Sequence, residues 1–257
     1  MSAGTSVGIV GGVDPQDGNI IVNSGGAGVV VSQMLSPSNS LDISATDYAI
    51  LRNKIYETQP STFLGDGSEL GIDLVTLHDD TGDFNPDRFG VGPTLNDIGD
   101  ADGGANNSIN FPVLNSVSQS GNTATINYSL DAADSPAGTY RLEFFANDTA
   151  DSSGYGEGQT FLGAITSNNG NNQQTSLSLP TGYSLSGKSI SSTTTAIDST
   201  KPSGFGSTSE FSKNIQVASG LTSGLASTGQ NIKLLVIAAI GLVGASGAVL
   251  IAKNRKK

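Results

Sequence analysis

Residues 19–24 read Asn-Ile-Ile-Val-Asn-Ser, and 34 positions later residues 53–58 read Asn-Lys-Ile-Tyr-Glu-Thr. A second match follows, because Gly-Val-Val-Val at 28–31 recurs 43 positions later as Gly-Ile-Asp-Leu at 71–74. Short β-branched runs between Gly and Asn corners are typical of a solenoid, in which each coil buries its apolar side on the next. Residues 1–77 are therefore predicted to form part of a parallel β-helix. An ordinary antiparallel β-domain is the alternative.

The composition of the chain points to an all-β protein. Glycine occurs 34 times among 257 residues and charged residues make up only 14%. Together with abundant Ser, Thr and Asn, this favours short strands joined by many turns. The chain has no cysteine, which excludes disulfides, thiolate catalysis and cysteine-based zinc sites.

Residues 78–110 are predicted to be an irregular acidic connector, because acids, Asn, Gly and Pro replace the apolar runs. Asp97, Asp100 and Asp102 lie on a Gly-rich backbone with Asn96 and Asn106 nearby. Carboxylate and amide oxygens are the ligands that Ca²⁺ prefers, so these three aspartates are a candidate calcium site. A solvated acidic turn is the alternative.

From residue 111 to 217 the pattern changes to a period of two. Thr123–Leu130 alternates apolar and polar residues, and the segment around residues 140–144 does the same. Further strands are predicted at residues 160–165, 175–179, 189–197 and 211–217. Regular short strands separated by turn clusters favour an antiparallel β-sandwich of immunoglobulin-like type.

Four segments resemble one family. They are residues 96–107, 110–114, 153–163 and 208–212. These segments look like the connector and the terminal β-domain of bacterial cell-surface proteins with right-handed parallel β-helix repeats. The resemblance implies a partial right-handed parallel β-helix, an immunoglobulin-like β-sandwich and display on the cell surface.

The last 33 residues contain three consecutive signals. After a small polar spacer at 218–224, Leu225-Ala226-Ser227-Thr228-Gly229 precedes an uncharged apolar run at 234–252, and the chain ends in Lys253, Arg255, Lys256 and Lys257. Nineteen residues of helix span about 28 Å, which is close to the thickness of a bilayer's hydrocarbon core. The basic residues predict a cytoplasmic end.

This order is similar to a Gram-positive, LPXTG-like cell-wall sorting signal, here with Ala in place of Pro. The resemblance implies that a sortase cleaves between Thr228 and Gly229 and joins Thr228 to the peptidoglycan of the cell wall. The transmembrane helix at 234–252 and the basic tail would hold the pentapeptide outside the membrane within reach of the enzyme. A plain C-terminal membrane anchor is the alternative.

The charge distribution restricts the partners. All 23 acidic residues precede Gly229, and five of the 12 basic residues follow it. An exterior this acidic argues against binding of nucleic acid. Residues 1–8 have neither a basic nor an apolar segment of secretory length, so we expect the chain to be the C-terminal part of a longer exported protein.

The sequence thus predicts a wall-anchored structural or adhesin-like protein that binds glycans or surface proteins of a host or neighbouring cell. A carbohydrate-active enzyme, a polysaccharide lyase or hydrolase on a β-helix scaffold, is the rival hypothesis. His78 is the only histidine, and Arg52, Lys54 and Asp47 are the polar residues that a lyase would use. We expect no catalytic site.

Overall fold

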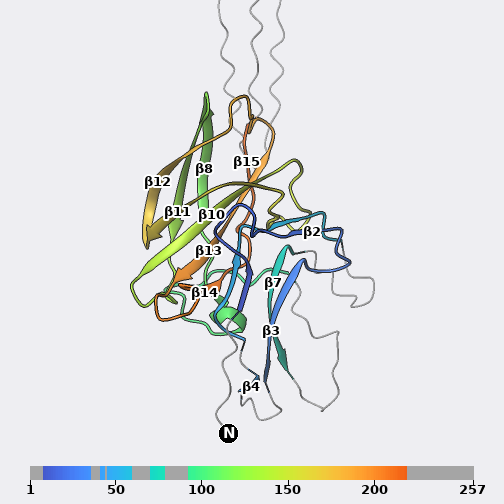
Figure 1. Ribbon diagram of the computed structural model, residues 1–257, viewed down its shortest axis with the longest axis vertical. Coiled ribbons are helices and arrows are strands. Elements are labelled where there is room, and N and C mark those ends of the chain that lie inside the picture. Colours follow the sequence, from blue (N-terminus) through green and yellow to red (C-terminus); the bar gives the residue numbers. More distant parts are fainter. Residues whose placement is uncertain (1–7, 36–40, 44, 60–69, 79–91, 219–257) are drawn as a thin grey trace, which may run out of the picture. The chain divides into compact units, whose positions relative to one another are not determined.

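The computed structural model describes residues 8–35, 41–43, 45–59, 70–78 and 92–218 (Figure 1). The chain divides into two compact units, Met1–Gly220 and Leu221–Lys257, and the described residues belong to the first. They form an all-β structure whose larger sheets are antiparallel. No helix among them is long and apolar enough to cross a membrane. The sorting signal at 225–229, the predicted span at 234–252 and the basic tail lie outside the described residues.

Three parallel strand pairs follow one another along the chain. They join β1 (Gly8–Gly11) to β5 (Tyr48–Leu51), β2 (Ile20–Val22) to β6 (Lys54–Tyr56) and β3 (Val29–Leu35) to β7 (Ile72–His78). Ile20 lies opposite Lys54 and Val29 lies opposite Ile72, so the offsets of 34 and 43 residues in the sequence are the registers of two of these pairs. A short strand, β4 (Leu41–Ile43), pairs antiparallel with the end of β3. We call residues 8–78 the parallel region.

Equivalent residues of the two sequence copies also contact each other at the corners. The side-chain oxygen of Asn53 accepts hydrogen bonds from the main-chain N–H of Asn19 at 3.0 Å and from the Asn19 side chain at 2.9 Å. Asn23 and Glu57, again 34 residues apart, both have a left-handed backbone, with φ of 56° and 57°. Asn tolerates this conformation better than most residues. Asn19 and Asn53 therefore connect the two segments by hydrogen bonds, and Asn23 and Glu57 form equivalent corners.

Residues 113–217 form two antiparallel sheets, which we call the antiparallel region. One sheet has the order β12-β9-β8, and the other has the order β11-β10-β13-β14 with β15 also paired to β13. The strands are β8 (Val113–Ser120), β9 (Thr123–Leu130), β10 (Thr139–Asn147), β11 (Thr160–Asn168), β12 (Gly170–Ser178), β13 (Ser189–Ile197), β14 (Phe205–Thr208) and β15 (Ile215–Gln216).

The core of the antiparallel region lies between its two sheets. Alternate residues of β9, such as Ile126 and Tyr128, are buried and meet Leu142 and Phe144 of β10. This confirms the strand predicted for Thr123–Leu130 and the apolar alternation predicted for residues 140–144. Burial of these side chains is the main source of stability in a domain without disulfides.

A second apolar cluster lies where the parallel and antiparallel regions meet. Ile50, Ile55 and Ile72 of the parallel region pack with Phe145 and Phe211 of the antiparallel region. The rings of Phe145 and Phe211 meet edge to face at 5.4 Å between centroids. The two regions therefore share one continuous apolar contact, which we call the junction.

Strand β13 is polar in sequence and nevertheless buried along almost its whole length. One of its faces covers the core of the antiparallel region and the other faces the junction. Some of its hydroxyl groups are paired: Ser192 donates to the carbonyl of Glu143 at 2.7 Å, and Thr195 and Thr208 share a hydrogen bond at 2.8 Å. The buried hydroxyls of Ser189, Thr193 and Thr194 form no hydrogen bond with a described residue. The strand predicted for residues 189–197 is confirmed.

The predicted fold class is confirmed, but the predicted parallel β-helix is not. The structure is all-β, as expected, but it does not show a parallel β-helix, because among the described residues parallel strands occur only in pairs and the sheets are mostly antiparallel. The segment predicted as a strand at 211–217 is one only at Ile215–Gln216, since Phe211 turns into the junction instead. Strands β8 and β14 carry too little apolar alternation to have been predicted.

Candidate functional site

The free edge of β6 is closed by a glutamate from the antiparallel region. Glu157 accepts hydrogen bonds from the main-chain N–H groups of Glu57 and Thr58, each at 2.7 Å, and from the Thr58 hydroxyl at 2.6 Å. Ile55 of β6 exchanges two main-chain hydrogen bonds with Gly158, at 3.1 and 2.7 Å. Residues 157–158 thus take the place that a further parallel strand would have beside β6.

Two other glutamates close the edges beside β5 and β7. The main-chain N–H of Arg52, next to β5, donates to Glu143 at 2.6 Å. The N–H of Leu74 in β7 donates to Glu210 at 2.9 Å, and the second oxygen of Glu210 accepts from the N–H of Thr94 at 2.8 Å. Glu143 and Glu210 are fully buried. We call Glu143, Glu157 and Glu210 the junction glutamates.

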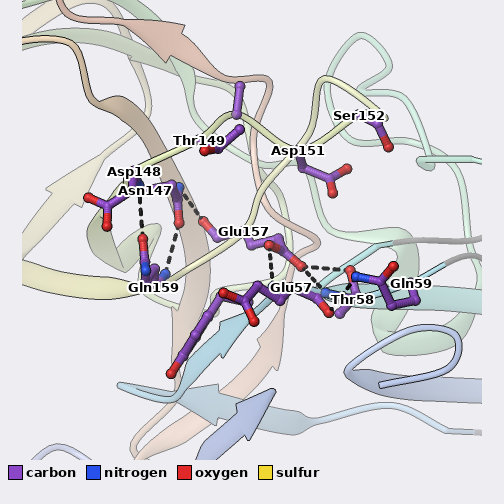
Figure 2. A pocket seen from close by; sticks show the side chains of 12 residues that line it. Glu57, Thr58, Gln59, Asn147, Asp148, Thr149, Asp151, Ser152, Glu157 and Gln159 are labelled. Carbon is purple, nitrogen blue, oxygen red and sulfur yellow. Dashed lines mark hydrogen bonds between the residues drawn. The ribbon is translucent and has the colours of Figure 1, made fainter. Parts of the chain in front are cut away.

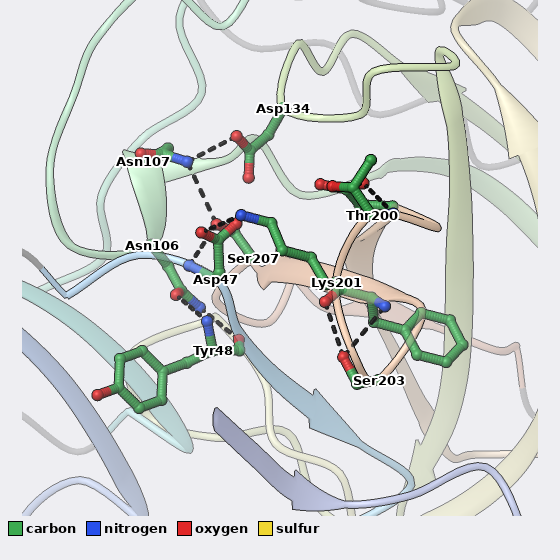
Figure 3. Close-up of polar contacts among 11 residues, drawn as sticks. Asp47, Tyr48, Asn106, Asn107, Asp134, Thr200, Lys201, Ser203 and Ser207 are labelled. Atoms are coloured by element: carbon green, nitrogen blue, oxygen red, sulfur yellow. Dashed lines mark hydrogen bonds and ion pairs between the residues drawn. The ribbon is translucent and has the colours of Figure 1, made fainter. Parts of the chain in front are cut away.

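Asn106 completes this edge (Figure 3). Its side chain accepts from the N–H of Tyr48 at 2.9 Å and donates to the Tyr48 carbonyl at 2.8 Å, which is how a neighbouring strand would pair. It also donates to the carbonyl of Thr208 at 2.9 Å, while the Thr208 hydroxyl accepts from the N–H of Ile50 at 2.8 Å. Asn106 belongs to a 3-10 turn, Ala105–Ser108, and has φ of 49°. The connector therefore joins both regions.

An ion pair flanks Asn106. Lys201 contacts Asp47 at 2.7 Å, and the hydroxyl of Ser207 accepts from the Asp47 main-chain N–H at 3.2 Å. Figure 3 also shows Asn107, whose amide donates to Asp134 at 2.6 Å and to Ser207 at 3.3 Å. These polar groups connect the connector, the parallel region and the loops beside β14.

Phe211 is the central apolar side chain of the junction. It is 3% exposed, and its ring lies against glycines of both regions. A Cβ atom on Gly71 would lie 2.7 Å from the ring, and one on Gly158 would lie 2.8 Å from it. Both distances are shorter than real contacts allow, so glycine at these positions permits the ring to seal the end of the parallel region.

Burial raises the pKa of each junction glutamate. Desolvation is the largest cause in every case, and it outweighs the hydrogen bonds from main-chain N–H groups, which lower the pKa. The effect is largest for Glu210, whose pKa is raised to about 8. For Glu143, the nearby charge of Arg141, whose side chain contacts it at 2.8 Å, opposes the effect of burial.

A polar cavity of about 370 Å³ opens beside Glu157 (Figure 2). Its walls come from residues 56–59 of the parallel region and from residues 147–159 of the antiparallel region. The side-chain oxygen of Asn147 accepts a hydrogen bond from the main-chain N–H of Gln159, and the side-chain oxygen of Gln159 accepts one from the N–H of Asp148. These two hydrogen bonds hold this wall of the cavity in place. Three acids, Asp148, Asp151 and Glu157, line this cavity. Asp148 pairs with Lys188, and Asp151 accepts the N–H of Ser153.

The structure brings the three candidate calcium ligands together. One oxygen from each of Asp97, Asp100 and Asp102 lies within 4.8 Å of the others. Burial, more than any other cause, raises the pKa of Asp100 to about 6, although its carboxylate accepts the N–H groups of Asn110 at 2.8 Å and Ala133 at 2.6 Å. Asp100 is thus mostly ionised at neutral pH and already holds two parts of the chain together. The donor set suits a hard cation.

The residues proposed for a lyase have other contacts. The guanidinium of Arg52 lies 4.3 Å from the ring centroid of Phe161, Asp47 pairs with Lys201, and Lys54 is exposed. His78 is the last residue of β7. Arg52 and Asp47 thus contact different side chains of the described residues.

The junction glutamates and the pairing role of Asn106 were not predicted from the sequence. Glu143 is an acid inside the apolar run Leu142–Ala146, and Glu210 precedes Phe211 in a Ser/Thr-rich segment. A lone acid in a strand that reads as buried is a signal for a fixed hydrogen-bond partner. Which partner it has depends on contacts more than 90 residues away, such as those from Arg52 to Glu143 and from Thr58 to Glu157.

The junction glutamates and Asn106 accept main-chain hydrogen bonds at the edge of the parallel strands. A polar cavity lies beside Glu157, and the acidic cluster of Asp97, Asp100 and Asp102 lies in the connector. No protein-family model and no curated protein sequence matches the chain.

Proposed function

We propose that this chain is the terminal, wall-anchored section of a cell-surface structural or adhesin-like protein. In this proposal the three parallel pairs are the last two coils of a right-handed parallel β-helix. The antiparallel region is an immunoglobulin-like sandwich that closes the end of that helix, and residues 225–257 attach the protein to the cell wall.

The observation that carries the proposal is the edge beside β5, β6 and β7. Main-chain N–H groups at this edge bond to the junction glutamates, to Asn106 and to Thr208. An open solenoid end would expose these groups and invite pairing with other chains. Acceptors built into a following domain are what a terminal cap needs.

The strand orders support the immunoglobulin-like part. Three strands, β12-β9-β8, face a sheet built from β11, β10, β13, β14 and β15, and the core lies between them. Sandwiches of the immunoglobulin class divide their strands between two antiparallel sheets in a similar way. The apolar and Tyr side chains of β9 and β10 take the place of a disulfide in this core.

The attachment is tested by substitution in the full chain, exported in a Gram-positive cell that has sortase. Thr228→Ala removes the residue whose carbonyl would be attacked, so the protein should leave the wall fraction released by muramidase and stay with the membrane. Ser227→Ala, at the variable position of the motif, is the control and should leave attachment unchanged. Covalent wall attachment that survives Thr228→Ala would contradict the sortase proposal.

The same experiment distinguishes sortase attachment from a plain membrane anchor. If the protein with Thr228 intact is found in the membrane fraction and not in the wall fraction, the plain membrane anchor is supported. The carbohydrate-active enzyme is less well supported, since Arg52 and Asp47 are engaged by Phe161 and Lys201. Release of unsaturated or reducing ends from acidic polysaccharides by the purified chain would favour the enzyme instead.

A further inference from the structure

An apolar pocket of about 380 Å³ opens on the surface of the protein. Residues 95–96, 111–114 and 213–215 line it together with Tyr155, and most of these side chains are aliphatic. Leu95 is 63% exposed and Val113 is 49% exposed. Exposed apolar side chains that gather around a pocket mark binding sites, and pockets that hold small molecules start at about 300 Å³. This pocket is therefore large enough for a small apolar ligand.

Hydrogen bonds hold the walls of the pocket in place. The side chain of Asn96 donates to the carbonyl of Phe111 at 2.7 Å and accepts from the N–H of the same residue at 3.0 Å. The main-chain N–H of Asn214 donates to the carbonyl of Gly154 at 2.9 Å. The rings of Phe111 and Tyr155 meet edge to face, with 5.7 Å between their centroids. A pocket with fixed walls has little order left to gain on binding, which favours affinity.

The charge at the pocket restricts the ligand. Lys213 is the only charged residue among the described residues that line it. Its side chain is exposed and forms no ion pair with a described residue, although the chain has 23 acids and only 12 bases. The polar cavity beside Glu157, in contrast, is lined by four acids and by no base among the residues described there. The apolar pocket is thus complementary to a ligand with an apolar body and one negative charge.

We propose that this pocket binds a small amphiphilic carboxylate, a fatty acid of medium chain length. Its alkyl chain would lie against Leu95, Val113 and Ile215, and its carboxylate would pair with the ammonium group of Lys213. A neutral apolar ligand would leave this ammonium unpaired, and a cationic amphiphile would be repelled by it. Each CH₂ group that the pocket buries should tighten binding by up to about fourfold. This binding is independent of the proposed wall attachment.

The exposed position of Lys213 sets the size of the charge effect. A pair of exposed charges contributes up to about fivefold in affinity, because water screens it. A carboxylate should therefore bind up to about fivefold more tightly through this contact than a ligand that lacks the charge, and the advantage should shrink at high salt. The alkyl chain supplies the larger share of the affinity.

Photolabelling of the full-length chain tests the proposal. The probe is decanoic acid with a diazirine near the end of its alkyl chain, and every variant is kept in the same mild detergent, so that all meet the same free concentration of ligand. After irradiation, mass spectrometry of the peptides should place the label on residues 95–96, 111–114 or 213–215. Decanoate and decanol are then compared as competitors that displace the probe.

Lys213→Gln should raise the concentration of decanoate needed for displacement by about fivefold and leave that of decanol unchanged. Lys54→Gln, with the same loss of charge at an exposed residue outside the pocket, should change neither. Leu95→Gln should weaken both competitors, because it removes an apolar wall. Both Lys213 and Leu95 are exposed, so the fold should be kept, which circular dichroism can verify.

Labelling that occurs only outside the pocket would overturn the proposal. Displacement by decanoate that Lys213→Gln does not change would overturn it as well, since the charge would then have no part in binding. Decylamine that displaces the probe better than decanoate would contradict the assignment of the ligand as an anion.

Discussion

The parallel and antiparallel regions satisfy their main-chain hydrogen bonds in different ways. In the antiparallel region β10 has a neighbouring strand on each side, β11 and β13, and the core is made by the region's own side chains. In the parallel region β5, β6 and β7 have one parallel partner each. Their other edges bond to the junction glutamates, to the side chains of Asn106 and Thr208, and to the main chain of Gly158. The parallel region therefore depends on its neighbour for closure.

This difference shows how a stack of strands can end without a polar surface. Backbone N–H groups need acceptors wherever water is excluded. The junction glutamates and Asn106 provide acceptors of fixed position, and Phe211 excludes water from the same face. A few residues thus connect the two regions. Substitutions at Phe211 test the apolar contribution to this connection, and substitutions at the junction glutamates test the polar contribution.

The largest effect is expected from Phe211→Ala. Removing a buried Phe side chain costs about 3–5 kcal/mol, and here the loss falls on the junction. Phe144→Ala, at an equally buried site in the core of the antiparallel region, is the matched comparison. Hydrogen exchange should show that Phe211→Ala reduces protection first in β6 and β7, whereas Phe144→Ala reduces it in β9 and β10.

Equal loss of protection in both regions from both substitutions would contradict the comparison. It would mean that the two regions unfold as one cooperative unit, and that the junction does not limit the stability of the parallel region separately.

The sequence predicted the parallel pairing better than it predicted the junction. The offsets of 34 and 43 residues reappear as the registers of β2 with β6 and of β3 with β7, because local repeats show which segments are equivalent. The alternation in Thr123–Leu130 likewise identified β9. The repeat offsets and the apolar alternation are visible in the sequence itself, without knowledge of contacts between distant residues.

The junction could not be predicted in the same way. Glu143, Glu157 and Glu210 read as ordinary acids, and β13 reads as a polar strand, because their burial results from a second region that covers them. Asn106 offers calcium an amide oxygen in the sequence, but in the structure its amide pairs with Tyr48 and Thr208. The three aspartates Asp97, Asp100 and Asp102, in contrast, are close in sequence and are close in space.

A second effect is a loss of stability at high pH. The pKa of Glu210 is raised in the folded protein to about 8, so the folded state binds its proton more tightly than the unfolded state does. The stabilisation is complete below the unfolded pKa and is lost as pH rises through 8. Between pH 6 and pH 9 this group should lower the free energy of unfolding by roughly 3 kcal/mol.

Thermal denaturation at each pH measures this effect, and Glu210→Gln should remove most of it, since Gln is neutral throughout. Asp148→Asn is a control on an exposed acid whose pKa is lowered by its hydrogen bond to Lys188. A Glu210→Gln variant that keeps the full decline in melting temperature between pH 6 and pH 9 would show that other groups cause it.

The smallest effect is expected from calcium. If the ion binds Asp97, Asp100 and Asp102, a concentration ten times the dissociation constant stabilises the fold by about 1.4 kcal/mol. That should raise the melting temperature by about 3–5 °C in a chain of this size. Asp97→Asn plus Asp102→Asn should remove the rise, and Asp14→Asn plus Asp17→Asn, with the same change in charge, should keep it.

A melting temperature that does not respond to millimolar calcium would leave these aspartates as an acidic turn. In that case Asp100 still has its structural role, because it accepts the main-chain N–H groups of Asn110 and Ala133.

The most direct test of the closed edge is hydrogen exchange at the amides of Arg52, Thr58 and Leu74, followed by NMR in the unmodified protein. Each of these N–H groups donates to a different junction glutamate. The account predicts that they exchange about as slowly as amides in the centre of β10, such as Leu142, because water cannot reach them while the junction is closed. Exchange at the rate of exposed loop amides would show that this edge is open and would contradict the capping of the parallel region.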